Sequence, residues 1–211
     1  MNSVASCLRR LAYRLRRLGH HHGYGVHSPW AFEYINRVIL ERAPYYAYAE
    51  LHRQLADNPD LSAICPVHEP AKVCRLLLRI VNRAQPVSIV DVGPKSVGEH
   101  YLRAGKRGVA YTYYNMGGTS QAPAPGQAST LLYVHDVDHP QAVEDALLAF
   151  LPFVDPATTF LVYGIGHNAA MATLWRRFIE RPEVGVSFDL YDIGIAFFDP
   201  TKMKRNYIVN F

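Results

Sequence analysis

The chain has 211 residues, of which 49% are hydrophobic, 19% charged and 12% aromatic. This composition excludes an intrinsically disordered protein, and a total of 3 cysteines excludes a small domain held together by disulfides. The net charge of +4 is only mildly basic and does not favour nucleic acid as a partner. No apolar run approaches the ~20 residues needed to span a bilayer. We therefore expect a cytoplasmic globular protein with reduced cysteines.

The first 22 residues concentrate the positive charge of the chain. Five arginines alternate with leucines at helical spacing, which predicts a basic amphipathic helix (Leu8, Arg9, Arg10, Leu11, Arg14, Leu15, Arg16, Arg17, Leu18). Such a helix either packs its leucines on the domain or binds a membrane surface, an acidic partner or RNA, and we favour packing. The run His20 to His22 follows, and adjacent histidines cannot easily bind one metal ion together.

Helices are expected next over residues 30–40, 45–56 and 70–83. Ser28 followed by Pro29 is a typical helix start, with the serine as N-cap and the proline at the first helical position. We interpret residues 1–84 as a helical N-terminal preface that packs on a core domain of residues 85–211.

From residue 87 onward the hydrophobic pattern changes to that of buried strands. Strands are predicted over 87–92, 109–114, 130–135, 158–163, 184–191 and 194–198, with another over 207–211. Helices are predicted over 97–104, 141–153 and 169–180. The alternation predicts βαβ units and a mostly parallel sheet, whereas the successive strands at the end predict an antiparallel hairpin. The expected fold class is therefore α/β.

A glycine-containing turn, Asp91-Val92-Gly93-Pro94-Lys95-Ser96-Val97-Gly98, joins the first predicted strand to a helix. Glycines let the backbone approach a ligand closely, and the N–H groups at a helix start attract negative charge. The pattern also occurs in turns that need small residues for packing alone, so both interpretations stay open.

Three segments together resemble the class I S-adenosylmethionine-dependent methyltransferases, in particular a bacterial subfamily with a helical preface. They are HGYGVHSPWAFEYI (residues 22–35), IVDVGPKSVG (residues 89–98) and FDLYDIGIAFF (residues 188–198). The resemblance implies a Rossmann-like sheet, S-adenosylmethionine as cofactor and methyl transfer to a small-molecule or protein acceptor. A homo-oligomer is compatible with it.

The resemblance assigns cofactor binding to seven residues, namely Asp91, Gly93, Lys95, Ser96, Gly98, Tyr114 and Asn115. Two features depart from the family. The second strand ends Tyr113-Tyr114-Asn115, without the carboxylate that holds the ribose hydroxyls. The loop of residues 115–129 is too short for the family's next helix and strand, so we expect one edge strand to be missing. The chain is thus similar to a degenerate family member with a partly eroded cofactor site.

The catalytic residues are unknown, and the candidates are Asp136, His139 and His167. One alternative is a catalytically inactive pseudoenzyme that acts as a binding or scaffold module. Another is a metal-dependent hydrolase that uses His135, Asp136, Asp138 and His139.

Simpler roles compete for the same residues, and we expect no metal site. Asp136 and Asp138 would cap the next helix, and His167 with Asn168 would form a helix N-cap. His27 and Ser28 could face the pocket, although capping alone explains the serine.

Overall fold

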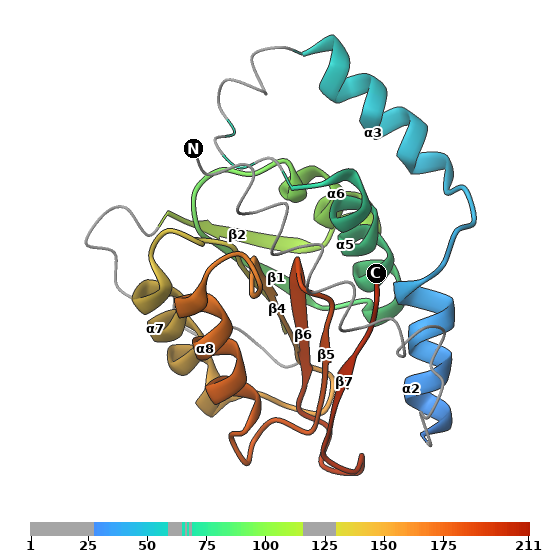
Figure 1. The fold of residues 1–211 in the computed structure, drawn as a ribbon. Helices are drawn as coiled ribbons and strands as arrows, with labels where there is room; N and C mark the ends of the chain where they lie inside the picture. The colour runs from blue at the N-terminus through green and yellow to red at the C-terminus, as the bar shows by residue number, and fades with distance from the viewer. Residues whose placement is uncertain (1–27, 59–64, 66, 68, 116–129) are drawn as a thin grey trace.

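The computed structural model describes residues 28–58, 65, 67, 69–115 and 130–211. The predicted Arg-rich helix, the run His20 to His22 and His27 lie outside this part. A seven-stranded sheet with the order β2-β1-β3-β4-β6-β5-β7 forms the centre of the fold (Figure 1). Its strands are β1 Ser88–Val92, β2 Ala110–Tyr114, β3 Thr130–Val134, β4 Thr159–Tyr163, β5 Val186–Asp189, β6 Ile193–Phe197 and β7 Arg205–Ile208.

The strand directions confirm the predicted fold class. Strands β2, β1, β3 and β4 pair in parallel, whereas β6 runs antiparallel to both β4 and β5. The final strand β7 pairs in parallel with β5, so it adds a strand beyond the predicted hairpin. Within the described residues β2 is an edge strand of the sheet, which agrees with the expected loss of one family strand.

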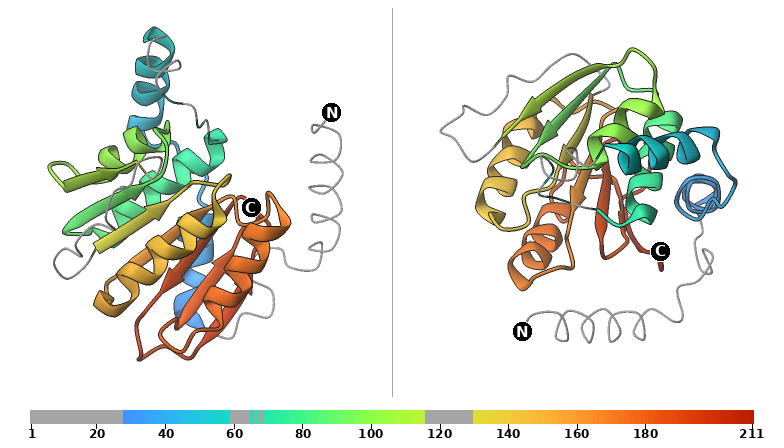
Figure 2. Two further views of the ribbon diagram at one scale, coloured as in Figure 1. Left: turned by 90° about the vertical axis from the view of Figure 1, so that its left-hand side faces the viewer. Right: turned by 90° about the horizontal axis from the view of Figure 1, so that it is seen from above.

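Two layers of helices cover the sheet (Figure 2). The helices α5 Ala71–Ala84 and α6 Gly98–Gly105 pack on one face, and α7 Pro140–Phe150 and α8 Ala169–Ile179 pack on the other. Successive residues of each strand alternate between the two cores, since Ile89 lies in the first and Val90 in the second. A sheet buried on both faces explains the nearly continuous apolar strands of the sequence.

The N-terminal helices begin as the sequence predicts. The side chain of Ser28 accepts a hydrogen bond from the Ala31 N–H at 3.3 Å, so the predicted cap of α2 (Pro29–Tyr34) is confirmed. The predicted single helix over 30–40 is wrong in its second half, which is the π-helical turn η1 (Ile35–Ile39). Helix α3 (Tyr46–Asp57) follows and lies at the periphery, beyond α5 and α6 (Figure 1).

A buried guanidinium lies at the end of η1. Arg79 of α5 donates to the carbonyls of Val38 at 2.6 Å and Ile39 at 3.0 Å. This contact spans about 40 residues of sequence, so local periodicity could not predict it. The apolar residues of α2, η1 and α5 belong to the same core as one face of the sheet, while the domain division after residue 84 stays a prediction. In the part of the chain described here, no helix has the length and apolar character needed to cross a bilayer.

Candidate functional site

The loop after β1 lies where the glycine turn was predicted. Its glycines, however, pack against side chains of the protein. Gly93 has a φ of +145°, and a Cβ atom there would lie 3.0 Å from the His135 ring. The Gly93 N–H donates to the Tyr114 carbonyl at the end of β2, at 2.9 Å. Gly93 therefore serves at least the close packing of His135, whether or not a ligand also approaches it.

Asp91, a predicted cofactor residue, is buried in a polar cluster. Its Oδ1 lies 2.6 Å from His135 Nε2, and the Tyr111 hydroxyl donates to its other oxygen. Since an ionised carboxylate only accepts hydrogen bonds, Nε2 carries the proton of the pair. Burial, and then the charge of Asp91, raise the pKa of the Tyr111 hydroxyl far above its usual range. Both oxygens of Asp91 are thus engaged inside the protein.

Glu69, which belongs to no recognisable sequence motif, completes the cluster. Its Oε1 accepts from the Tyr133 hydroxyl at 2.7 Å, and its Oε2 accepts from the Gly98 N–H at 3.1 Å. A Cβ at Gly98 would lie only 2.6 Å from Glu69 Oε1, so the second glycine allows this approach. The carboxylate occupies the N-terminus of α6, where negative charge is favourable. No local motif marks Glu69, because its partners lie 29 and 64 residues further along the chain.

Three buried polar atoms in or beside this loop have no hydrogen-bond partner within the described residues: Ser96 Oγ, Tyr113 Oη and His135 Nδ1. Ser96 and His135 are each 1% exposed. The Lys95 ammonium lies above the Tyr113 ring, 4.2 Å from its centroid, and 3.4 Å from a Glu99 oxygen. Buried polar groups in proteins are rarely left unpaired, so this cluster is the feature of the loop that most clearly points to a polar ligand.

The predicted acidic segment after β3 separates into two parts. His135 contacts Asp91, whereas the Asp136 carboxylate contacts His139 Nδ1 at 2.9 and 3.0 Å. Asp136 and His139 therefore contact each other, but His135 is paired with Asp91 and does not join them in one site. Among the described residues no group of three or more His, Cys, Asp or Glu could hold a metal ion, and the hydrolase hypothesis is not supported.

The predicted capping role of Asp136 and Asp138 is also wrong. Helix α7 has His139 as N-cap without any side-chain capping bond. The Asp136 carboxylate reaches the His139 ring instead of a backbone N–H of the first turn. The His139 side chain is 70% exposed, so this pair lies at the surface.

His167 lies after β4 in a chain of polar contacts that the sequence did not reveal. Its Nε2 is 3.1 Å from Asp192 Oδ1, and Asp192 Oδ2 is 2.7 Å from Lys72 Nζ. Asp192 is buried and lies between β5 and β6. Lys72 lies in the first turn of α5. The neighbouring Asn168 caps α8 through a bond from the Met171 N–H at 2.8 Å, as predicted.

No protein-family model matches the chain, and no curated protein matches its sequence. Solved structures do match. The SAH-bound methyltransferase PaMTH1 of Podospora anserina aligns with a TM-score of 0.54 and 10% identity, over 81% of this chain and 96% of its own. The SAH complex of an O-methyltransferase from Bacillus cereus aligns with a TM-score of 0.40 and 11% identity, over 78% and 96%. The SAM complex of the O-methyltransferase TomG from Streptomyces achromogenes has a TM-score of 0.41 and 15% identity, over 78% and 94%. The sheet topology together with the PaMTH1 alignment gives this chain the fold of the class I S-adenosylmethionine-dependent methyltransferases.

Proposed function

We propose that the protein is an S-adenosylmethionine-dependent methyltransferase-like protein that binds its cofactor at the Gly93 loop, in a partly eroded site. The observation that carries the proposal is the set of buried atoms of Ser96, Tyr113 and His135 around this loop that have no hydrogen-bond partner within the described residues. A polar ligand that pairs them would remove a cost of about 1–3 kcal/mol for each group. The SAH and SAM complexes named above support this ligand by analogy of fold.

The residues fit the two ends of the cofactor unequally. At the loop, Lys95 supplies a positive charge and Ser96 a hydroxyl for the amino-acid end. The Gly98 N–H is already bonded to Glu69, so it is not available to a carboxylate of the ligand. At the end of β2, Asn115 stands where the family has a carboxylate, and its amide oxygen accepts fewer hydrogen bonds than a carboxylate. We therefore expect weaker binding than a complete site would give.

Bound S-adenosylmethionine supplies a methyl group already activated by its sulfonium, so the protein needs mainly to position an acceptor and accept a proton. We assign the proton-accepting role to His167, a predicted candidate. The Asp192 carboxylate holds the protonated Nε2 of its ring, which leaves Nδ1 as the acceptor atom in the neutral imidazole. Lys72 fixes Asp192 from the other side.

The tautomer of His167 tests this assignment. We expect ¹⁵N NMR at neutral to mildly alkaline pH to show a protonated Nε2 and an unprotonated Nδ1. Asp192→Asn is expected to change this tautomer preference, whereas Asp136→Asn, which alters the pair with His139, leaves it unchanged. A proton on Nδ1 of the neutral ring would contradict the role.

The cofactor proposal predicts a selective effect of Ser96→Ala. The substitution removes a buried hydroxyl that has no partner within the described residues, so the free energy of unfolding of the ligand-free protein should rise by about 1 kcal/mol. If the hydroxyl bonds the cofactor, the Kd for S-adenosylmethionine, measured by titration calorimetry, should rise about fivefold. Trp175→Phe is the matched control. It removes the indole Nε1, which also has no partner within the described residues, from the core on the opposite face of the sheet, so the Kd should stay unchanged.

The proposal would be refuted if titration calorimetry detected no binding of S-adenosylmethionine or S-adenosylhomocysteine at millimolar concentration. This outcome would favour the alternative, a catalytically inactive scaffold module. The hydrogen bond of Asp91 to His135 inside the protein favours the same alternative. We propose a cytoplasmic location and a small-molecule acceptor.

A further inference from the structure

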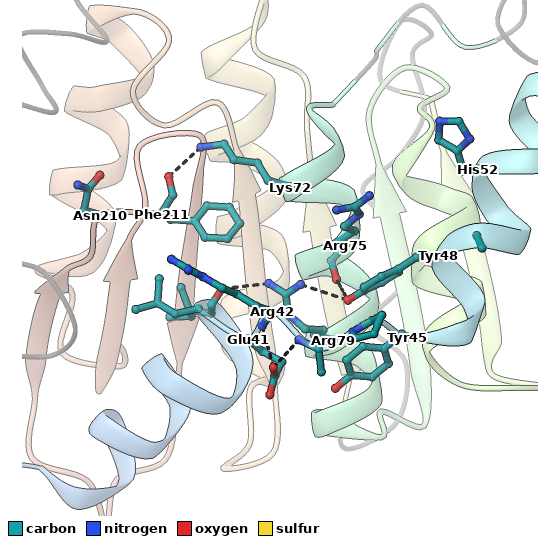
Figure 3. Close-up of a pocket in the computed structure, with 15 residues that line it drawn as sticks. Glu41, Arg42, Tyr45, Tyr48, His52, Lys72, Arg75, Arg79, Asn210 and Phe211 are labelled. Atoms are coloured by element: carbon teal, nitrogen blue, oxygen red, sulfur yellow. Dashed lines mark hydrogen bonds between the residues drawn. The ribbon is translucent and has the colours of Figure 1, made fainter.

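A cavity with a volume of about 780 Å³ lies outside the Gly93 loop (Figure 3). It is formed by the end of η1, the segment that leads into α3, the first half of α3, one side of α5, and the last two residues, Asn210 and Phe211. No residue of the Gly93 loop lines it. Its volume falls in the range of small-molecule sites, roughly 300–1,000 Å³.

The lining of this cavity is strongly cationic. Arg42, Lys72, Arg75 and Arg79 line it, and Glu41 is the one acidic side chain among the lining residues. Glu41 is held by its own turn, because its Oε1 accepts from the backbone N–H groups of Arg42 and Ala43, each at 2.7 Å. It therefore compensates the cations only in part.

Arg79 forms the rigid inner wall. Its guanidinium is buried and donates to Val38, Ile39 and the Tyr48 hydroxyl, the last at 3.1 Å. All three acceptors are neutral oxygens, and Arg79 forms no ion pair with a carboxylate of the described residues. Its full charge therefore contributes a positive potential to the cavity, and its bond to Tyr48 fixes that ring.

Arg75 and Arg42 supply exposed positive groups. The Arg75 guanidinium lies over the Tyr48 ring, 5.3 Å from its centroid. Neither arginine forms an ion pair within the described part of the chain. Tyr45 lies against Tyr48, with ring centroids 5.3 Å apart, so two aromatic faces border the cationic groups. A guanidinium fork matches carboxylate and phosphate oxygens, and an aromatic face accepts a planar ring.

We propose that this cavity is a binding site for a planar organic anion, with its carboxylate or phosphate on Arg75 and Arg42 and its ring against Tyr45 and Tyr48. The cavity shares no residue with the Gly93 loop, and Lys72 links it to the proposed proton acceptor through Asp192. Lys72 is occupied by Asp192 and by the Phe211 carbonyl, the latter at 2.9 Å, so it closes the cavity at one end.

The test is calorimetric titration of the full chain with phenyl phosphate, benzoate and inorganic phosphate. We expect phenyl phosphate or benzoate to bind at least tenfold more tightly than inorganic phosphate, because only they carry the ring. The stronger of the two identifies which acid group the site prefers. Arg75→Gln is expected to weaken that binding about tenfold, as is typical of a lost charged hydrogen bond.

Controls separate this site from general charge effects and from the cofactor. Arg176→Gln removes an exposed arginine of α8, on the opposite face of the sheet, and should leave the affinity unchanged. Ser96→Ala should also leave it unchanged, whatever its effect on S-adenosylmethionine. Arg42→Gln provides a second variant should Arg75→Gln fail to fold. Absence of binding at millimolar phenyl phosphate and benzoate, equal binding of inorganic phosphate, or an equal loss in Arg176→Gln would overturn the proposal.

Discussion

Asp91→Ala is expected to lower the free energy of unfolding by about 3 kcal/mol. The carboxylate accepts from His135 at 2.6 Å and from the Tyr111 hydroxyl. Asp91 and His135 are each 1% exposed, so water cannot easily replace the lost partner of the imidazole. A buried donor that is left unpaired costs about 1–3 kcal/mol, and this substitution leaves two.

Urea unfolding monitored by tryptophan fluorescence and circular dichroism measures this loss. Adding Tyr111→Phe to the variant should recover part of the stability, because it removes the Tyr111 hydroxyl, a donor that Asp91→Ala leaves without an acceptor. The control is Asp136→Ala, whose His139 partner is 70% exposed, and we expect it to cost less than about 1 kcal/mol. An Asp91→Ala protein as stable as the control would show that the cluster does not hold the loop.

Gly105→Ala is also expected to lower the free energy of unfolding by about 3 kcal/mol. A Cβ at this position would lie 2.5 Å from Val81 Cβ and 2.8 Å from the Leu78 carbonyl oxygen. Both atoms belong to α5 and neither can rotate away, so α5 and α6 must move apart. Helix propensity alone would give the opposite sign, because alanine is favoured over glycine by about 1 kcal/mol within a helix.

Thermal and urea unfolding distinguish these two signs directly. Combining Gly105→Ala with Val81→Ala should not restore stability, because Val81 Cβ and the Leu78 carbonyl remain in place. A single variant more stable than the parent would instead mean that propensity dominates and that the two helices pack less closely than they do here.

Much of the fold could be predicted because its signals are local. The apolar runs at residues 88–92 and 159–163 became central strands, and the Ser28 and Asn168 caps hold their helices. The π-helical end of the first helix was missed, because Arg79 contacts it from 40 residues away. The capping role expected for Asp136 failed because a nearby imidazole competes for its carboxylate.

The candidate site was predictable only in its outline. The glycine turn located the loop correctly, but the sequence could not show that His135 packs on Gly93 or that Glu69 approaches Gly98. The resemblance led us to expect that the end of β2, where the tyrosines lie, lacks a carboxylate for the cofactor's ribose. Only the structure showed that the Tyr111 hydroxyl donates to Asp91 and that the Tyr113 hydroxyl has no partner among the described residues.

The sequence by itself determined the class of fold, the order of its elements and the composition of the core, because 3.6-residue and two-residue periodicities are set by neighbours along the chain. Tertiary structure alone decided which polar groups meet. Glu69 reaches Tyr133, Lys72 reaches Asp192, and Arg75 faces a cavity closed by Phe211, all through contacts between distant segments. Hydrogen-bond partners depend on distances of about 3 Å in space, and sequence separation carries no information on such distances until the chain is folded.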